Sequence, residues 1–153
     1  MATQASYKPQ FYVDGLKPAQ ADDAYPLIRA IAPEVSLDAW RDYVQRRYRS
    51  GGLLGLRSES GAVVGVLSYR LGERMRHGQV LALDDFVTFE LSQAAPGRTA
   101  LLEAAEKLAL ELGCTGLELR VGSRGFADEH NAKAQGWTSL GLALDSVIFV
   151  KPL

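Results

Sequence analysis

The sequence predicts an α/β fold: a single domain over residues 1–153, with a mixed, largely antiparallel sheet of six to seven strands and one parallel β-α-β crossover. Three observations predict it. Short apolar segments of strand length outnumber the helical ones. An amphipathic helix lies between the apolar strands Val80–Thr88 and Leu117–Val121, and a crossover of this length implies parallel pairing. No internal repeat or low-complexity linker divides the chain.

Composition limits the classes of partner. Of the 153 residues, 47% are hydrophobic, which is enough for a sizeable core. The formal net charge is −1, so no basic excess indicates a nucleic-acid partner. No apolar run reaches the ~18 residues of a membrane span, and the N-terminus lacks the pattern of a signal peptide. We therefore expect neither nucleic-acid nor membrane binding.

Cysteine and histidine usage argues against a metal site. Cys114 is the only cysteine, which excludes an internal disulfide and favours a buried, inert thiol. The two histidines, His77 and His130, lack the spacing of zinc ligands. The simplest location for such a chain is a reducing, cytoplasmic compartment.

The first third of the chain predicts one strand and two helices. Phe11–Leu16 is the strand, and apolar residues at helical spacing follow it twice. The residues that begin and end these helices are, in order, Asp22 or Asp23, Pro33, Ser36 and Gly51 with Gly52.

The middle of the chain predicts a hairpin and a central strand. Leu53–Arg57 and Ala62–Arg70 are strands joined by a turn at Glu59–Gly61. Leu71–Gly78 is a polar connection. Val80–Thr88 is apolar apart from two aspartates, so we expect it to be covered on both faces.

The last third predicts a helix with an apolar stripe from Leu101 to Leu112, ended by Gly113. The remaining predicted elements are the strand Leu117–Val121, a short helix over Ala127–Gln135 with Gly136 past its end, and the paired strands Trp137–Leu142 and Val147–Lys151.

The turn before the long helix could bind an anion. A strand that leads through small residues to a helix N-terminus directs backbone N–H groups and the helix dipole toward one point. An ordinary strand-to-helix connection fits the spacing equally well. The turn comprises Gln93, Ala94, Ala95, Pro96, Gly97 and Arg98, and Thr99 opens the helix.

Asp84 and Asp85 are the polar pair of an otherwise apolar strand. Strand alternation sends them to opposite faces, so only one can point into a cleft. A buried carboxylate needs hydrogen bonds or a counter-charge. Either one aspartate is a general base or orients an amine, or both are held by backbone or by an arginine such as Arg70 or Arg120.

The stretch from Gln79 to Gly113 resembles the cofactor-binding core of the GNAT superfamily of acetyl-CoA-dependent N-acetyltransferases. Leu83–Thr88, read LDDFVT, matches the family strand pattern V-D-D-L-V-T. Gln93 matches the first position of the loop R/Q-x-x-G-x-G/A, and Ala100–Leu102 matches the helix start A-L-L. In this alignment the two glycine positions of that loop hold Pro96 and Arg98, with Gly97 between them. A shift by one residue places Ala95 and Gly97 there instead, with a one-residue insertion and Ser92 in place of Gln93. The predicted order of elements is also similar to that of the GNAT fold.

The resemblance implies transfer of an acetyl group from acetyl-CoA to a primary amine of a small molecule or peptide, without a metal. It implies that the main chain of Phe86, Val87 and Thr88 pairs with the pantetheine arm. The pyrophosphate would lie over Gln93, Ala94, Ala95, Gly97, Arg98, Thr99 and Ala100, with Asn131 as a further cofactor contact.

The resemblance also implies the catalytic candidates Asp84, Asp85 and His130. His130 lies near a family segment in which a tyrosine three residues later often protonates the departing thiolate; this chain has Lys133 there. The alternative is a non-catalytic GNAT-fold domain that binds a ligand or a partner. The C-terminal strands could also pair two subunits into a homodimer.

The second predicted helix ends in a basic run, Arg46, Arg47, Tyr48 and Arg49. Such a run is typical of a solvated face, and it could equally rim the opening of a site for acidic substrates.

Overall fold

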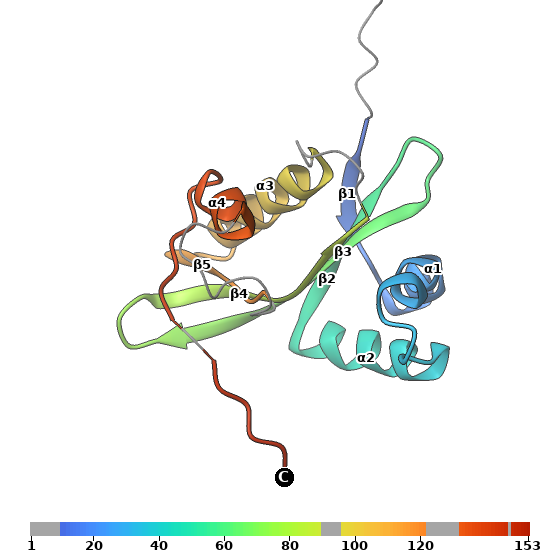
Figure 1. Ribbon diagram of the computed structural model, residues 1–153, viewed down its shortest axis with the longest axis horizontal. Coiled ribbons are helices and arrows are strands. Elements are labelled where there is room, and N and C mark those ends of the chain that lie inside the picture. The colour runs from blue at the N-terminus through green and yellow to red at the C-terminus, as the bar shows by residue number, and fades with distance from the viewer. Residues whose placement is uncertain (1–9, 90–95, 122–131, 147) are drawn as a thin grey trace, which may run out of the picture. The chain divides into compact units, whose positions relative to one another are not determined.

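The computed structural model describes residues 10–89, 96–121, 132–146 and 148–153 (Figure 1). The chain divides into two compact units, Met1–Val121 and Gly122–Leu153. The single domain over residues 1–153 stays a prediction.

The first unit is built on a five-stranded mixed sheet with the strand order β1-β2-β3-β4-β5. Neighbours from β1 to β4 are antiparallel, and β5 is parallel to β4. The parallel β-α-β crossover predicted from the sequence is therefore confirmed. The strands are β1 (Tyr12–Gly15), β2 (Gly51–Arg57), β3 (Val63–Arg74), β4 (Gly78–Thr88) and β5 (Gly116–Leu119).

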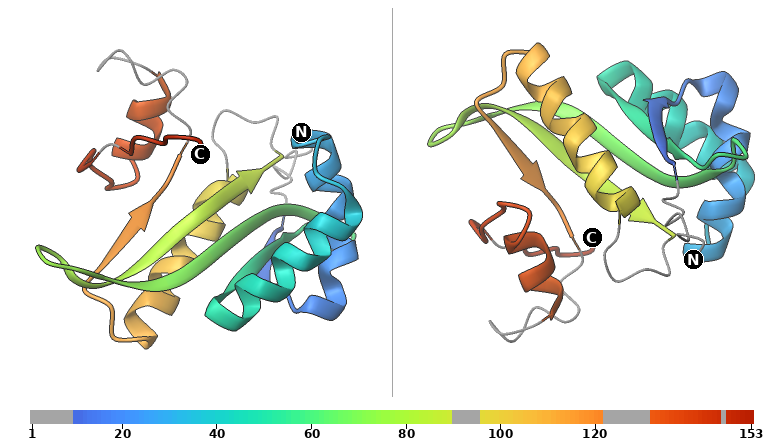
Figure 2. Two further views of the ribbon diagram at one scale, coloured as in Figure 1. Left: turned by 90° about the horizontal axis from the view of Figure 1, so that it is seen from below. Right: turned by 90° about the horizontal axis from the view of Figure 1, so that it is seen from above.

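Helices cover both faces of this sheet. Figure 2 shows α1 and α2 on one face and α3 on the other. A short 3₁₀ turn, η1, precedes α1. The bounds are η1 (Pro18–Gln20), α1 (Ala21–Ile31), α2 (Leu37–Ser50) and α3 (Pro96–Glu111).

Local signals begin and end these helices as the sequence indicates. The Ser36 hydroxyl accepts a hydrogen bond from the Ala39 N–H at 3.1 Å, which satisfies one of the unpaired donors of the first turn of α2. Gly113, just past α3, has φ +76°, a conformation that closes a helix and favours glycine. Cys114 follows it and is buried, as predicted.

The hydrophobic core joins α1 and α2 to the sheet. Trp40 and Val44 of α2 pack there against Val66 of β3, and the Trp40 indole N–H donates to the Ala21 carbonyl at 2.7 Å. On the opposite face Leu101 of α3 is fully buried, and its side chain comes close to Gly65. The central strand is buried from Val80 to Leu83. Both faces of β4 are therefore covered, as its apolar sequence predicts.

The hairpin between β3 and β4 is longer than predicted. The expected polar connection Leu71–Gly78 is mostly strand, since β3 runs to Arg74 and β4 begins at Gly78. Polar residues suit this stretch because it reaches beyond the part covered by helices and only alternate positions are half-buried. An ion pair between Arg74 and Glu118 of β5, 2.6 Å between Nε and Oε1, adds to its ordering.

The second unit contains the helix α4 (Ala132–Thr138) in its described part. Gly136 lies inside this helix rather than past its end. The predicted strand Trp137–Leu142 is wrong, because the chain there leaves α4 through hydrogen-bonded turns; Ser139 N–H donates to the Gln135 carbonyl at 2.9 Å. The predicted strand Val147–Lys151 is also absent from the described residues, where Phe149 and Val150 are 93% and 84% exposed.

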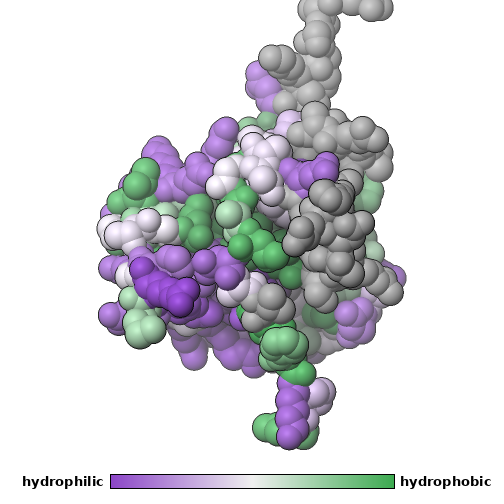
Figure 3. Space-filling model, turned by 60° about the vertical axis from the view of Figure 1, so that its left-hand side comes forward, coloured by the Kyte–Doolittle hydropathy of each residue, from purple (hydrophilic) through white to green (hydrophobic). Residues whose placement is uncertain are grey.

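The described residues thus hold five strands, and the six to seven predicted from the sequence are not supported. Figure 3 shows hydrophilic and hydrophobic residues interspersed over one face of the molecule. Within the described ranges, no helix combines the length and apolar character needed to cross a membrane.

Candidate functional site

A β-bulge lies in β4 beside its two aspartates. Asp85 is opposite Ser68 of β3, and Leu83 is opposite Tyr69. Asp84 therefore has no partner of its own in the ladder and is the extra residue of the bulge. A bulge of this kind bends the strand and re-aims the side chains next to it.

The bulge places both carboxylates on the face covered by α2. Asp84 contacts Arg47 of α2, and Asp85 contacts Tyr43 of the same helix. The expectation that the two aspartates face opposite sides is wrong, because strict alternation holds only in a regular strand. The extra residue interrupts the alternation of side chains between the two faces of the sheet, so Asp84 and Asp85 lie on the same face.

Asp84 is held by two arginines. Its Oδ2 lies 3.0 Å from Arg47 Nη1 and 2.8 Å from Arg70 Nε, and its side chain is only 10% exposed. Arg70 Nη2 also donates to Oδ1 at 3.4 Å. Two guanidinium groups balance the buried charge, which is the condition for burying a carboxylate. The ion pair between Asp84 and Arg70 is the arrangement that the sequence allows as the alternative to a catalytic role.

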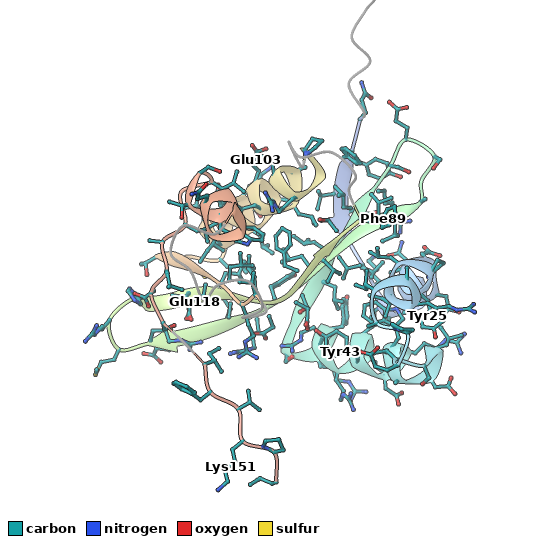
Figure 4. The ribbon with its side chains drawn as sticks, in the orientation of Figure 1. Tyr25, Tyr43, Phe89, Glu103, Glu118 and Lys151 are labelled. Atoms are coloured by element: carbon teal, nitrogen blue, oxygen red, sulfur yellow. The ribbon has the colours of Figure 1, made fainter. Side chains whose placement is uncertain are left out.

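Asp85 lies in a separate hydrogen-bonded cluster. The Tyr43 hydroxyl donates a short hydrogen bond to Asp85 Oδ2 and lies 2.9 Å from the Ser68 hydroxyl. Ser68 Oγ, which is fully buried, also donates to Asp85 Oδ2 at 3.3 Å and accepts from the Asp85 N–H at 3.0 Å. Figure 4 shows Tyr43 on α2. Unlike Asp84, the Asp85 carboxylate is exposed and its described partners are hydroxyl groups.

The surroundings of Tyr43 favour its neutral form. Partial burial raises the pKa of Tyr43, and the hydrogen bond to Asp85 raises it further, whereas the Ser68 contact lowers it. The ring also stacks on Trp40 and lies under the Arg47 guanidinium, 5.6 Å from its centroid. Tyr43 is therefore a fixed, protonated donor to the Asp85 carboxylate.

Past the bulge, β4 and β5 stop pairing. Their parallel ladder runs from Val80 to Leu83, and at its end the Arg120 N–H donates to the Leu83 carbonyl at 3.0 Å. β4 continues to Thr88, and no described strand pairs with it on that side. The predicted pantetheine residues Phe86, Val87 and Thr88 are in this part of β4, on which Val87 faces the α1–α2 core.

Only part of the predicted pyrophosphate loop belongs to the described residues. Pro96 is the first residue of α3, so Gly97, Arg98, Thr99 and Ala100 form the first turn of the helix and not a preceding loop. Proline suits this position because the N–H it lacks has no partner inside the helix. Gln93, Ala94, Ala95, His130 and Asn131 lie outside the described residues, and Lys133 has no described side chain.

Sequence reasoning missed Tyr43, Arg47 and Ser68 as members of the site. For the basic run at the end of α2 the sequence allows either a solvated face or the rim of a site for acidic substrates; the Arg47 side chain is only 18% exposed and is bound to Asp84. The available signal was helical spacing: Arg47 is four residues past Tyr43, and a turn-by-turn stripe of Trp40, Tyr43, Val44 and Arg47 faces the sheet.

A surface pocket of about 150 Å³ adjoins these two clusters. Its lining consists of α2 residues, and two of them also bind the aspartates. The four are Tyr43, Arg46, Arg47 and Ser50. The described residues contain no cluster of side chains able to hold a metal ion.

Comparison with known proteins supports a fold assignment. The sequence matches no family model and no curated protein. The structure resembles an aminoglycoside N-acetyltransferase in complex with CoA, with a TM-score of 0.78 and 11% identity over 97% of this chain and 98% of that one.

Two further neighbours are similar over nearly their whole length. A ribosomal-protein-alanine N-acetyltransferase from Brucella melitensis has a TM-score of 0.73 and 18% identity over 94% of this chain and 99% of that one. An aminoglycoside 6′-N-acetyltransferase from Acinetobacter baumannii has a TM-score of 0.74 and 13% identity, with the same coverage. The chain therefore has the fold of the GNAT superfamily of N-acetyltransferases.

Proposed function

We propose that the protein is an N-acetyltransferase that moves an acetyl group from acetyl-CoA to a primary amine of a small molecule or peptide. The observation that carries the proposal is the position of Asp85. This exposed, hydroxyl-bound carboxylate lies on β4 immediately before the stretch that no described strand accompanies on the β5 side. The structural neighbours act, by name, on amine-bearing antibiotics and on a protein alanine.

The residues of β4 and α3 fit the cofactor. A strand edge without a described neighbour can bond an extended ligand that carries amide groups, as the pantetheine arm does. The N-terminus of α3, with Arg98 in its first turn, offers backbone N–H groups and positive charge for a pyrophosphate. Phe86–Thr88 and the first turn of α3 are thus our proposed cofactor contacts, together with Gln93, Ala94, Ala95 and Asn131.

The two aspartates take different roles in this proposal. Asp84 is a positioning residue, because both of its oxygens already accept hydrogen bonds from guanidinium groups. Asp85 accepts the proton of the attacking amine, and Tyr43 and Ser68 fix the orientation of its carboxylate. Acetyl-CoA supplies the acetyl group as a reactive thioester. His130 remains a candidate acid from the sequence alone.

The proposed reaction does not depend on a strong general acid. Holding the amine and the thioester in the reactive geometry lowers the barrier by removing the entropy cost of their encounter. The rival function is a non-catalytic domain that binds acetyl-CoA or a partner, which the Pro96 and Arg98 substitutions at the family's glycine positions favour. A cytoplasmic location and a homodimer remain predictions from the sequence.

Two measurements test the function. Acetyl-CoA at ~100 times its dissociation constant should raise the unfolding free energy by about 2.7 kcal/mol. Arg98→Glu should weaken that stabilisation by reversing the charge at the helix N-terminus, whereas the matched Lys107→Glu, on an exposed part of the same helix, should not.

Thiol release from acetyl-CoA over a panel of amines, amino acids and peptides then measures turnover. Stabilisation with release above the no-enzyme blank supports the transferase. Stabilisation without release favours the binding domain, and the absence of both contradicts the two functions.

A further inference from the structure

The face of α2 beside Asp85 carries more positive charge than its carboxylates neutralise. Arg47 and Arg70 share the single carboxylate of Asp84. Arg46 adds a third guanidinium, and it forms no ion pair with any described residue. Asp85 is bound by Tyr43 and Ser68 rather than by an arginine. A net positive charge therefore remains at this end of the helix.

The surplus charge coincides with the pocket on α2. Arg46 and Arg47 line it together with Tyr43 and Ser50. The Arg47 Nε is buried and has no hydrogen-bond partner among the described residues. A buried donor of this kind normally has a partner, because leaving it unsatisfied costs free energy. An anionic oxygen in the pocket would be matched by the guanidinium groups of its two lining arginines, since arginine presents its donors as a planar fork suited to carboxylate and phosphate.

The pocket is linked to the proposed base by one side chain. Tyr43 lines the pocket, and its hydroxyl donates to Asp85. Consider an acceptor whose anionic group binds at Arg46 and Arg47. If its amine lies about the length of a tyrosine side chain from that anionic group, the amine would be near Asp85.

We propose that this pocket binds the anionic group of the acceptor, so that the substrates are primary amines that also carry a carboxylate or a phosphate. This inference rests on the proposed transferase function and names its substrate class. The basic run at the end of α2 then acts in part as the rim of a site for acidic substrates, one of the two interpretations that its sequence allows.

Binding of inorganic phosphate tests the pocket without any turnover. We would titrate phosphate into the wild type, Arg46→Gln and Arg49→Gln. Binding would be followed by tryptophan fluorescence, to which Trp40 contributes, or by the heat of binding. Arg49 is the matched control, because it is an exposed arginine of the same helix that does not line the pocket.

Loss of the charged hydrogen bond should weaken phosphate binding about tenfold in Arg46→Gln and leave Arg49→Gln within about twofold of the wild type. Absence of phosphate binding, or binding that Arg46→Gln and Arg49→Gln alter equally, would overturn the inference.

Kinetics with paired acceptors tests the substrate class and separates the sources of the anion. The pairs are ω-amino carboxylates of increasing length against their carboxamides, and O-phosphoethanolamine against ethanolamine. We expect the charged member of at least one pair to have a higher kcat/KM by about tenfold, through a lower KM, and this preference to vanish in Arg46→Gln.

The two proposals fail in different ways. Turnover of neutral and charged members at equal rates would refute the anionic acceptor and leave the transferase intact. No turnover of any amine would refute the transferase, and the phosphate titration would still decide whether the pocket binds anions.

Discussion

Asp84→Asn should be one of the most destabilising single-atom changes in the first unit. The variant keeps the size of the side chain and removes the charge that Arg47 and Arg70 share at 3.0 Å and 2.8 Å. The amide can accept from one guanidinium, but its NH₂ group then faces the other. Two like charges remain close together, with Arg47 only 18% exposed.

The magnitude follows from burial. Removing one partner of a fully buried ion pair costs about 3–5 kcal/mol. Arg70 is 34% exposed, so solvent screens its share, and we expect a loss of about 2–3 kcal/mol for the whole cluster. In a chain of this length that corresponds to a fall in Tm of roughly 5–10 °C.

The assay is urea unfolding followed by tryptophan fluorescence, with Asp22→Asn as the matched control. Asp22 also pairs with an arginine, at 2.6 Å from Arg41 Nη2, but both side chains are about half exposed. We expect the control to lose far less stability. An Asp84→Asn variant with the same unfolding midpoint as Asp22→Asn would show that the buried cluster does not hold β4 to α2.

Two further predictions concern the second cluster. Asp85→Asn should reduce thiol release by about 100-fold or more if its carboxylate takes the amine proton. It should lose less stability than Asp84→Asn, because Asp85 is exposed. Equal melting temperatures and equal activity in the two variants would contradict the division of roles. Tyr43→Phe should flatten the alkaline limb of the stability curve. Because folding raises the pKa of Tyr43, its contribution to stability is present below the unfolded tyrosine pKa of about 10 and is lost as the pH rises through the higher folded pKa. Tyr69, whose pKa burial also raises, is unchanged in both proteins, so identical unfolding curves from pH 9 to 11 would rule out this role for Tyr43.

The main helices and the parallel crossover could be predicted because their signals lie within one stretch of the chain. The Ser36 cap and Gly113 act on their own helices, and the apolar stripe from Leu101 fixes which side of α3 meets the sheet. The parallel pairing of β4 with β5 follows from the length of the crossover.

The shared face of the two aspartates could not be predicted, because a bulge is a property of a strand pair. The sequence around Asp84 shows no glycine or proline that would mark it. The basic run that contains Arg47 was open to two interpretations, and Tyr43 was not identified as a site residue, because the sequence does not show which strand α2 covers. The predicted C-terminal strand Val147–Lys151 begins with a short apolar run around Phe149, and such a run forms a strand only when a partner strand lies beside it.

The bulge in β4 also has a consequence for how this strand can change in length. Asp84 is an insertion relative to a regular hairpin, because Leu83 and Asp85 face consecutive residues of β3, Tyr69 and Ser68. Deleting it would join two stretches of ladder that are already in phase, so no other side chain of β4 would change face. One residue can therefore be removed from β4 at this point without changing which face of the sheet the other side chains of the strand occupy. What that deletion would take away is the local bend of β4 and the anchor of Arg47 and Arg70. The geometry of the site thus depends on a residue that the continuity of the sheet does not require.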